Sequence, residues 1–167
     1  MQGPHLVQMS SQKMAVVRTE GDPNVVGPKV MKPLYGSVYT LKSILKKKGI
    51  DFRVGALRAR WPNAPNAPKD KWLGIWGLPV PNDTTSLPQK IPEVEVRLEV
   101  WDYGLVAEVL HKGPYSTEQN SILRLLDFIK DNGCEVVGSH EEEYLTKPTA
   151  SVVKTIIRLP VRKLSDK

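Results

Sequence analysis

The segment richest in side chains capable of chemistry is His140-Glu141-Glu142-Glu143-Tyr144. Alternate side chains of a strand point to opposite faces, so Glu142 would share a face with His140 and Tyr144, while Glu141 and Glu143 face the other way. Two interpretations are open. The segment is either a solvated acidic edge, or Glu142 faces a cavity in which a carboxylate and an aromatic ring suit a large, flat or cationic ligand.

Other aromatic side chains are spaced so that they could line such a cavity. Trp72 and Trp76 would alternate onto one face of a predicted strand, and Tyr35 and Tyr39 lie four positions apart on a predicted helix. Trp61 lies in the first half of the chain where Tyr144 lies in the second, if the two halves are related copies. Each ring could instead be ordinary core packing. The candidate ligand-binding aromatics are Tyr35, Tyr39, Trp61, Trp72 and Trp76.

A third candidate segment, His111-Lys-Gly-Pro-Tyr115, joins a predicted strand to a predicted helix through a Gly-Pro turn signal. His111 and Tyr115 are candidate ligand-binding residues, although a histidine at a strand end is also a common structural feature. The sequence contains no Ser/His/Asp set and no glycine-rich phosphate loop. The single cysteine, Cys134, and three histidines do not form a spaced set of zinc ligands. We therefore expect neither a metal nor another cofactor.

Two long amphipathic helices and several strands are predicted to position these residues. Leu34, Val38, Leu41 and Leu45 follow helical spacing within 30–48, which ends in lysines and a glycine. The second helix spans 115–132, with Ser116 and Gln119 as a capping box. Residues 93–100 alternate between apolar and charged types, as in a half-buried strand. Further strands are predicted at 14–19, 52–61, 71–78, 105–111, 134–145 and 152–161.

Short sequence motifs that occur twice indicate that these elements form two copies of one unit. Val54-Gly55 returns as Val137-Gly138 after the second helix, and Leu78-Pro79-Val80 returns as Leu159-Pro160-Val161. The chain is therefore predicted to be an α+β protein of duplicated strand-helix-strand-strand units, with an antiparallel sheet, two long helices and a pocket between pseudo-symmetric halves. The predicted segments are an N-terminal extension at 1–13, one domain at 14–162 with repeats at about 14–81 and 93–162, loops at 61–68 and 81–92, and a tail at 163–167.

Several of these motifs together resemble one family. The segments at 107–115, His-Glu-Glu-Glu-Tyr-Leu-Thr-Lys-Pro at 140–148 and Lys-Thr-Ile-Ile-Arg-Leu-Pro-Val at 154–161 are similar to the GyrI-like small-molecule-binding family. That family also provides the effector-binding domains of several AraC-type and MerR-type multidrug regulators. In the first half, 20–24 and 34–42 are similar to its stand-alone members. The resemblance covers nearly all residues from 14 to 162.

The resemblance implies a ligand pocket where the repeats meet and a buried glutamate that answers cationic or polar groups of hydrophobic ligands. Residue by residue, that glutamate is Glu142 and the motif tyrosine is Tyr144. Some stand-alone relatives are hydrolases that open cyclopropane rings of DNA-alkylating natural products. If this chain is an enzyme, its catalytic residues are expected to be Glu142 and Tyr144. However, Arg58 stands where those hydrolases carry an acid, which speaks against hydrolysis but not against binding.

Composition limits the partners. The 167 residues are 40% hydrophobic and carry a net charge of +6, with a basic first half and an acidic second half that would attract each other. No apolar stretch approaches a membrane span, and residues 1–13 do not read as a secretory signal, so we expect a cytoplasmic protein without a membrane partner. With no helix-turn-helix, direct DNA binding is not expected, and we expect a monomer or weak homodimer. The predicted function is the binding or sequestering of hydrophobic, aromatic or cationic small molecules; the alternative is the cyclopropane hydrolase.

Overall fold

The computed structural model describes residues 3–64 and 66–165 as two compact units. The first unit is residues 11–102, and the second unit combines residues 3–10 with residues 103–165. Pro65 of the predicted loop 61–68 lies outside the described residues, as do residues 1–2 and 166–167 of the predicted terminal segments.

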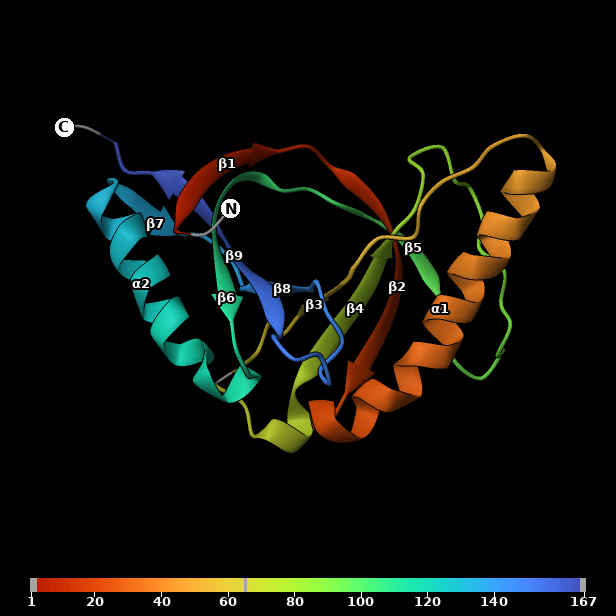
Figure 1. The fold of residues 1–167 in the computed structure, drawn as a ribbon, viewed down its shortest axis with the longest axis horizontal. Helices are drawn as coiled ribbons and strands as arrows, with labels where there is room; N and C mark the ends of the chain where they lie inside the picture. Colours follow the sequence, from red (N-terminus) through yellow and green to blue (C-terminus); the bar gives the residue numbers. More distant parts are fainter. Residues whose placement is uncertain (1–2, 65, 166–167) are drawn as a thin grey trace. The chain divides into compact units, whose positions relative to one another are not determined.

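The first unit is an antiparallel sheet with one helix packed on it (Figure 1). Its strands lie in the order β3-β4-β2-β5, and α1 contacts β2 and β4. The buried side chains include Met14, Val16, Leu34 and Leu78. The elements of the first unit are β2 (Gln12–Glu20), α1 (Pro23–Lys47), β3 (Leu57–Arg60), a short 3-10 helix (Lys69–Lys71), β4 (Leu73–Pro79) and β5 (Arg97–Trp101).

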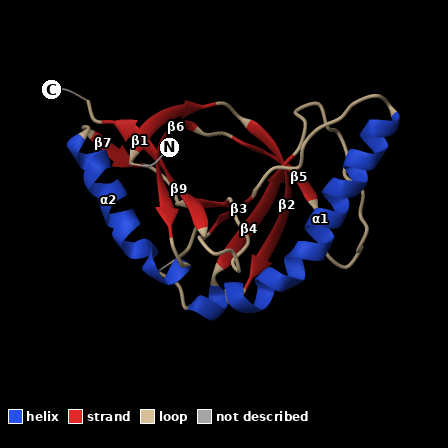
Figure 2. Ribbon diagram, viewed as in Figure 1, coloured by secondary structure: helices blue, strands red, loops and turns tan. Residues whose placement is uncertain are grey.

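The second unit repeats this plan, and Figure 2 shows the same combination of strands and one long helix. Its antiparallel strands lie in the order β1-β6-β9-β8, β7 also pairs with β9, and α2 contacts β6 and β7. Val109, Leu125, Ile129 and Ile157 belong to the core between helix and sheet. The elements are β1 (His5–Met9), β6 (Gly104–Lys112), a 3-10 helix (Tyr115–Thr117), α2 (Glu118–Asp131), β7 (Cys134–Val136), β8 (Glu141–Tyr144) and β9 (Lys154–Lys163).

The strand registers confirm the predicted duplication. Ala59 on β3 lies opposite Trp76 on β4, and Glu142 on β8 lies opposite Ile157 on β9. Trp76 and Ile157 each lie two positions before the Leu-Pro-Val sequence that the two copies share. Ala59 and Glu142 are therefore equivalent positions, and so are Trp61 and Tyr144. The α+β fold of two strand-helix-strand-strand units is confirmed.

Helix α1 begins seven residues earlier than predicted, at Pro23 instead of Val30. Asp22 caps it, because its side chain accepts a hydrogen bond of 2.8 Å from the backbone N–H of Asn24. Proline at the first helical position is compatible with a helix, since the N–H it lacks has no intrahelical partner there. The predicted end is confirmed at Lys47, and Gly49 follows with φ of 83°.

Two other local predictions were wrong. The capping box of Ser116 and Gln119 does not form: α2 begins at Glu118, after a turn of 3-10 helix, and its N-cap residue Thr117 makes no capping hydrogen bond through its side chain. The strand expected at 93–100 begins only at Arg97, and Val100 is 58% exposed instead of buried. On the opposite face of β5, the carboxylate of Glu99 accepts two hydrogen bonds from the Arg18 guanidinium on β2.

Three further features concern partners. No helix in the described part of the chain is long and apolar enough to cross a membrane. Within 3–64 and 66–165, no three His, Cys, Asp or Glu side chains are grouped so that they could hold a metal ion. Cys134 is a buried free thiol.

Candidate ligand-binding site

Strand β8 sorts the acidic segment onto two faces, as its alternation predicted. Glu142 lies opposite Ile157, a core residue under α2, whereas Glu141 lies opposite Arg158. Glu142 is only 7% exposed. A solvated acidic edge is therefore excluded for this residue, because its carboxylate is removed from water.

The buried carboxylate lies beside two tyrosines. The rings of Tyr115 and Tyr144 meet edge to face, with centroids 5.7 Å apart and planes at 67°. The Tyr144 hydroxyl lies 3.5 Å from Oε2 of Glu142, and Nε2 of His140 lies 3.7 Å from the same oxygen. Tyr115 is 41% exposed, so this cluster reaches the surface of the second unit.

Glu118, the first residue of α2, belongs to this cluster and was missed in the sequence. It is 8% exposed, and the side chain of Glu142 acts on it through both hydrogen bonding and charge. Burial and this neighbouring carboxylate raise the pKa of Glu118 to about 9. Burial also works against ionisation of Glu142, but hydrogen bonds from His140, Glu118 and Tyr144 outweigh it and lower its pKa. The pair thus holds one proton and one negative charge at neutral pH.

The two tyrosines stay neutral beside this charge. Burial and the negative charge of Glu142 raise the pKa of Tyr115 and raise that of Tyr144 well above its ordinary value. A neutral phenol ring presents a negative π face, which attracts cations. The cluster of Tyr115, Glu118, Glu142 and Tyr144, called the acidic aromatic cluster below, therefore combines the two groups that recognise an organic cation.

His111 holds the turn that carries Tyr115 and is fully engaged in doing so. Its Nε2 lies 3.0 Å from the carbonyl oxygen of Pro114, which can only accept, so Nε2 carries the proton. Its Nδ1 lies 2.8 Å from the Ser121 hydroxyl. Gly113 supplies the sharp turn with φ of 129°, a conformation that side chains rarely adopt. His111 is thus a positioning residue for Tyr115.

In the first unit, Trp61 and Trp76 also form a pair. Their rings meet edge to face, with centroids 5.8 Å apart, and the Trp76 indole donates a hydrogen bond of 2.9 Å to the Thr19 hydroxyl. Both are buried, at 8% and 6% exposed. Helix α1 passes Trp76 at Gly27, where a β-carbon would lie 3.3 Å from the ring. These tryptophans fit core packing in the first unit.

The other aromatic candidates make different contacts. Trp72 directly precedes β4 in extended conformation, and its indole donates a hydrogen bond of 2.9 Å to the carbonyl of Ala67. Tyr35 and Tyr39 stack on α1 with centroids 6.3 Å apart, and Tyr39 is 53% exposed. That Trp72 and Trp76 share one face therefore stays a prediction.

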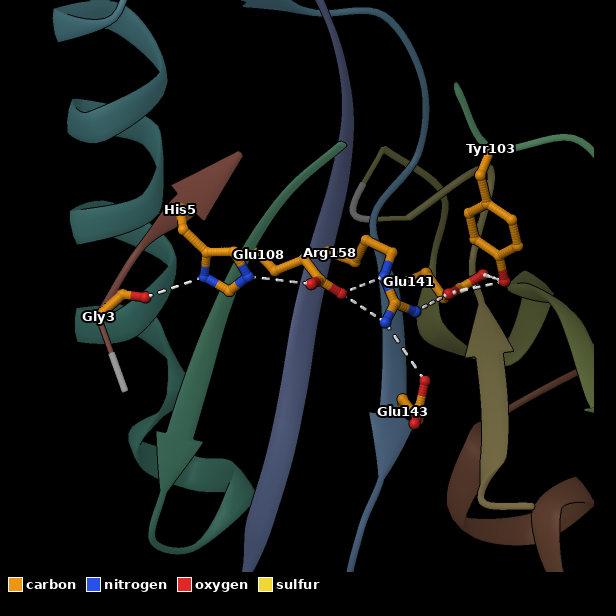
Figure 3. Close-up of polar contacts among 7 residues, drawn as sticks. All are labelled: Gly3, His5, Tyr103, Glu108, Glu141, Glu143 and Arg158. Atoms are coloured by element: carbon orange, nitrogen blue, oxygen red, sulfur yellow. Dashed lines mark hydrogen bonds and ion pairs between the residues drawn. The ribbon is translucent and has the colours of Figure 1, made fainter. Parts of the chain in front are cut away.

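The opposite face of β8 carries a different cluster, drawn in Figure 3. The Arg158 guanidinium is 4% exposed and pairs with Glu108 at 2.5 Å, with Glu141, and with Glu143 at 3.3 Å. The Tyr103 hydroxyl donates to Glu141, and His5 on β1 lies 3.2 Å from Glu108. Glu108, Glu141 and Glu143 thus each pair with one arginine of the second unit.

No protein-family model and no curated protein matches the chain. Among solved structures it is similar to an uncharacterized conserved protein from Listeria innocua, with 25% identity over 96% of this chain and 93% of that one and a TM-score of 0.83. A hydrolase from Listeria innocua is 26% identical over 96% and 92% of the two chains, with a TM-score of 0.81. The C-terminal domain of EcmrR shares 18% identity over 96% and 98%, with a TM-score of 0.68.

These similarities extend over nearly the whole chain. They include both strand-helix-strand-strand units, because 96% of the chain is covered in each case. The resemblance to the GyrI-like fold that the motifs indicated is therefore confirmed at the level of the fold.

Proposed function

We propose that this protein binds hydrophobic, aromatic or cationic small molecules, in the manner of a drug- or toxin-binding protein, and that Glu142 answers the positive charge. The observation that carries the proposal is a buried carboxylate set against two tyrosine rings. The motif resemblance to small-molecule-binding proteins supports the same function.

Glu142 has no fixed cation of full charge beside it among the described residues. Burying a carboxylate is costly unless it is paired. Within the described residues, no lysine or arginine forms an ion pair with Glu142, and its contacts to Tyr144 and His140 are long. A ligand cation placed against Glu142 would supply the missing charge, while Tyr115 and Tyr144 contribute cation–π attraction of about 0.5–2 kcal/mol.

The test compares a cation with a neutral molecule of similar shape, tetraphenylphosphonium and triphenylphosphine oxide, by calorimetric titration. Glu142→Gln keeps the side-chain volume but removes the charge, so we expect its affinity for the cation to fall about tenfold to a hundredfold. Affinity for the neutral probe should change little.

Glu143→Gln is the matched control, because it is the next residue of β8 and faces the Arg158 cluster. It should bind both probes like the parent. Equal losses for the cation and the neutral probe in Glu142→Gln, or an equal loss in Glu143→Gln, would contradict the role of Glu142.

Hydrolysis of cyclopropane-bearing alkylating natural products is the second candidate function. It is favoured by the similarity to a chain described as a hydrolase, at 26% identity. Glu142 would take a proton from water as the water oxygen bonds to a ring carbon; the ring C–C bond would break and its electron pair would pass to a phenolate. Positioned base catalysis contributes roughly 10²–10⁴-fold.

The two candidates are separated by mass spectrometry after incubation with such an alkylator. A hydrolase yields the water adduct in more than stoichiometric amount, and Glu142→Ala abolishes it. A binding protein returns the compound unchanged, and turnover at the parental rate in Glu142→Ala would exclude the proposed base.

A further inference from the structure

Two buried carboxyl groups, Glu118 and Glu142, interact through a hydrogen bond and through charge, and neither forms an ion pair with a lysine or arginine of the described residues. They come from different elements, the start of α2 and the strand β8, and are 8% and 7% exposed. Oε1 of Glu118 is buried and has no hydrogen-bond partner among the described residues. Two like charges in contact and out of water repel strongly, so a pair of this kind retains a proton.

The groups around the pair do not supply the positive charge that would let both carboxyl groups ionise. Tyr115 on the 3-10 helix and Tyr144 on β8 are neutral, and Nε2 of His140, just before β8, lies 3.7 Å from Oε2 of Glu142. The partial positive charge at the start of α2 stabilises one negative charge there. No lysine or arginine of residues 3–64 and 66–165 forms an ion pair with either carboxyl.

We propose that Glu118 couples cation binding to proton release: it holds a proton while the site is empty and gives it to the solvent when a cation docks against Glu142. The cation replaces the proton as the charge that compensates the second carboxylate. This inference rests on the proposed binding function and identifies Glu118 as the residue that makes binding specific for charge. Neutral ligands would bind without releasing the proton.

The expected consequence is an affinity that depends on pH. Because the pKa of Glu118 is raised to about 9, the free site is protonated below that pH and a cation must displace the proton. Affinity for the cation should therefore rise with pH up to about 9, by at most roughly tenfold per pH unit for one released proton. Affinity for a neutral probe should stay flat over the same range.

The experiment measures tetraphenylphosphonium binding to the full chain at pH 7.5 by calorimetry in buffers of different ionisation enthalpy. The slope of the observed enthalpy against the buffer enthalpy gives the number of protons released. We expect a release approaching one proton per cation for the parent and none for triphenylphosphine oxide. Cation binding with no proton release would overturn the inference but leave the binding function standing, whereas absence of cation binding would overturn both.

The variant Glu118→Gln tests whether Glu118 is the residue that releases the proton. The variant should still bind the cation through Glu142, but without proton release and with an affinity independent of pH between 7 and 9. Glu135→Gln is the matched control, because it makes the same substitution at an exposed ion pair of β7, and it should behave as the parent. Proton release unchanged in Glu118→Gln would overturn the assignment.

The pH dependence of the melting temperature, measured without ligand, tests the protonated state of Glu118 independently of binding. Folding raises the pKa of Glu118 from about 4.3 in the unfolded chain to about 9. The stability associated with this group is therefore fully present below about pH 4.3 and is lost as the pH rises toward 9. The melting temperature of the parent should therefore fall relative to that of Glu118→Gln between pH 5 and 9. Parallel pH profiles for the two proteins would contradict the protonated state of Glu118.

Discussion

At the scale of single residues, neighbouring carboxylates on β8 differ in the partners they have. Glu141 and Glu143 belong to the Arg158 cluster, where the ion pairs are made within the chain. Glu142 points to the other face and shares a proton with Glu118. The first group is paired within the fold, and the second is the carboxylate that we propose meets an external cation.

The Arg158 cluster makes a stability prediction. Arg158→Met would remove the guanidinium that pairs with Glu108 and Glu141, which are buried at 7% and 2% exposed. Breaking a buried pair in this way costs about 3–5 kcal/mol. We expect the free energy of unfolding in urea at pH 7 to fall by about that amount.

Arg162→Met is the matched control for that loss. Arg162 lies four residues further along β9 and pairs with Glu135, but its side chain is 70% exposed, and such exposed pairs contribute about 0–1 kcal/mol. Similar losses in the two variants would show that the Arg158 cluster does not behave as a buried ion network.

The sequence predicted part of this residue-scale division. Strand alternation alone separated Glu142 and Tyr144 from Glu141 and Glu143, because the period of a strand is two residues. It could not predict Glu118, which meets Glu142 only because α2 packs on the sheet of the second unit. The sole local signal was an acid in the first turn of a helix, and that position is normally explained by the helix dipole.

At the scale of elements, close packing in the first unit depends on a glycine in β4. A β-carbon on Gly77 would lie 2.9 Å from both the Trp101 ring and the Met14 side chain, and these residues are 3% and 0% exposed. The Trp101 ring is also covered by the Arg60 guanidinium, 3.9 Å from its centroid. The absence of a side chain at Gly77 leaves room for the Trp101 ring of β5 to pack over β4.

We therefore expect Gly77→Ala to destabilise the protein by about 1–3 kcal/mol through overpacking. Gly36→Ala is the contrasting variant, because it lies within α1 and its β-carbon would have an ordinary contact of 3.7 Å with Lys90. It should stabilise the protein by about 0.4–1 kcal/mol. Thermal unfolding measured under identical conditions decides, and a change of the same sign in both variants would contradict this packing.

The elements themselves were largely predictable, with errors at their boundaries. Apolar periodicity located both long helices and their lysine or glycine ends, but it missed the first seven residues of α1, which precede the regular spacing of Leu34, Val38, Leu41 and Leu45. The strand at residues 93–96 was wrong because alternation in sequence needs a partner strand, and β5 pairs with β2 only from Arg97. Strand β1 was missed because its pairing with β6 is remote in sequence.

At the scale of the whole molecule, the two copies differ where function is concerned. Ala59 occupies in the first unit the position of Glu142 in the second, so the duplicated plan carries this carboxylate once. The copies also take their outer strands from outside the repeat: β5 follows the first copy, while β1 lies at the start of the chain and pairs with β6 of the second unit.

This arrangement predicts which strands lose protection from hydrogen exchange when β1 is removed. Deleting residues 1–10 removes the strand along β6 and the contact of His5 with Glu108. Amide hydrogen exchange should become faster in β6, while protection in β2 and β4 of the first unit stays as in the parent. Unchanged protection of β6 would contradict the role of β1 as a structural strand of the second unit.

We propose above that a cation binds against Glu142 in the acidic aromatic cluster. The most direct test of this binding is a crystal structure of the complex with tetraphenylarsonium, in which anomalous scattering locates the arsenic atom. We predict one arsenic site per chain, beside the carboxylate of Glu142 and the rings of Tyr115 and Tyr144. Arsenic bound only elsewhere, for example at the exposed Tyr35–Tyr39 pair on α1, with none near Glu142, would contradict the claim.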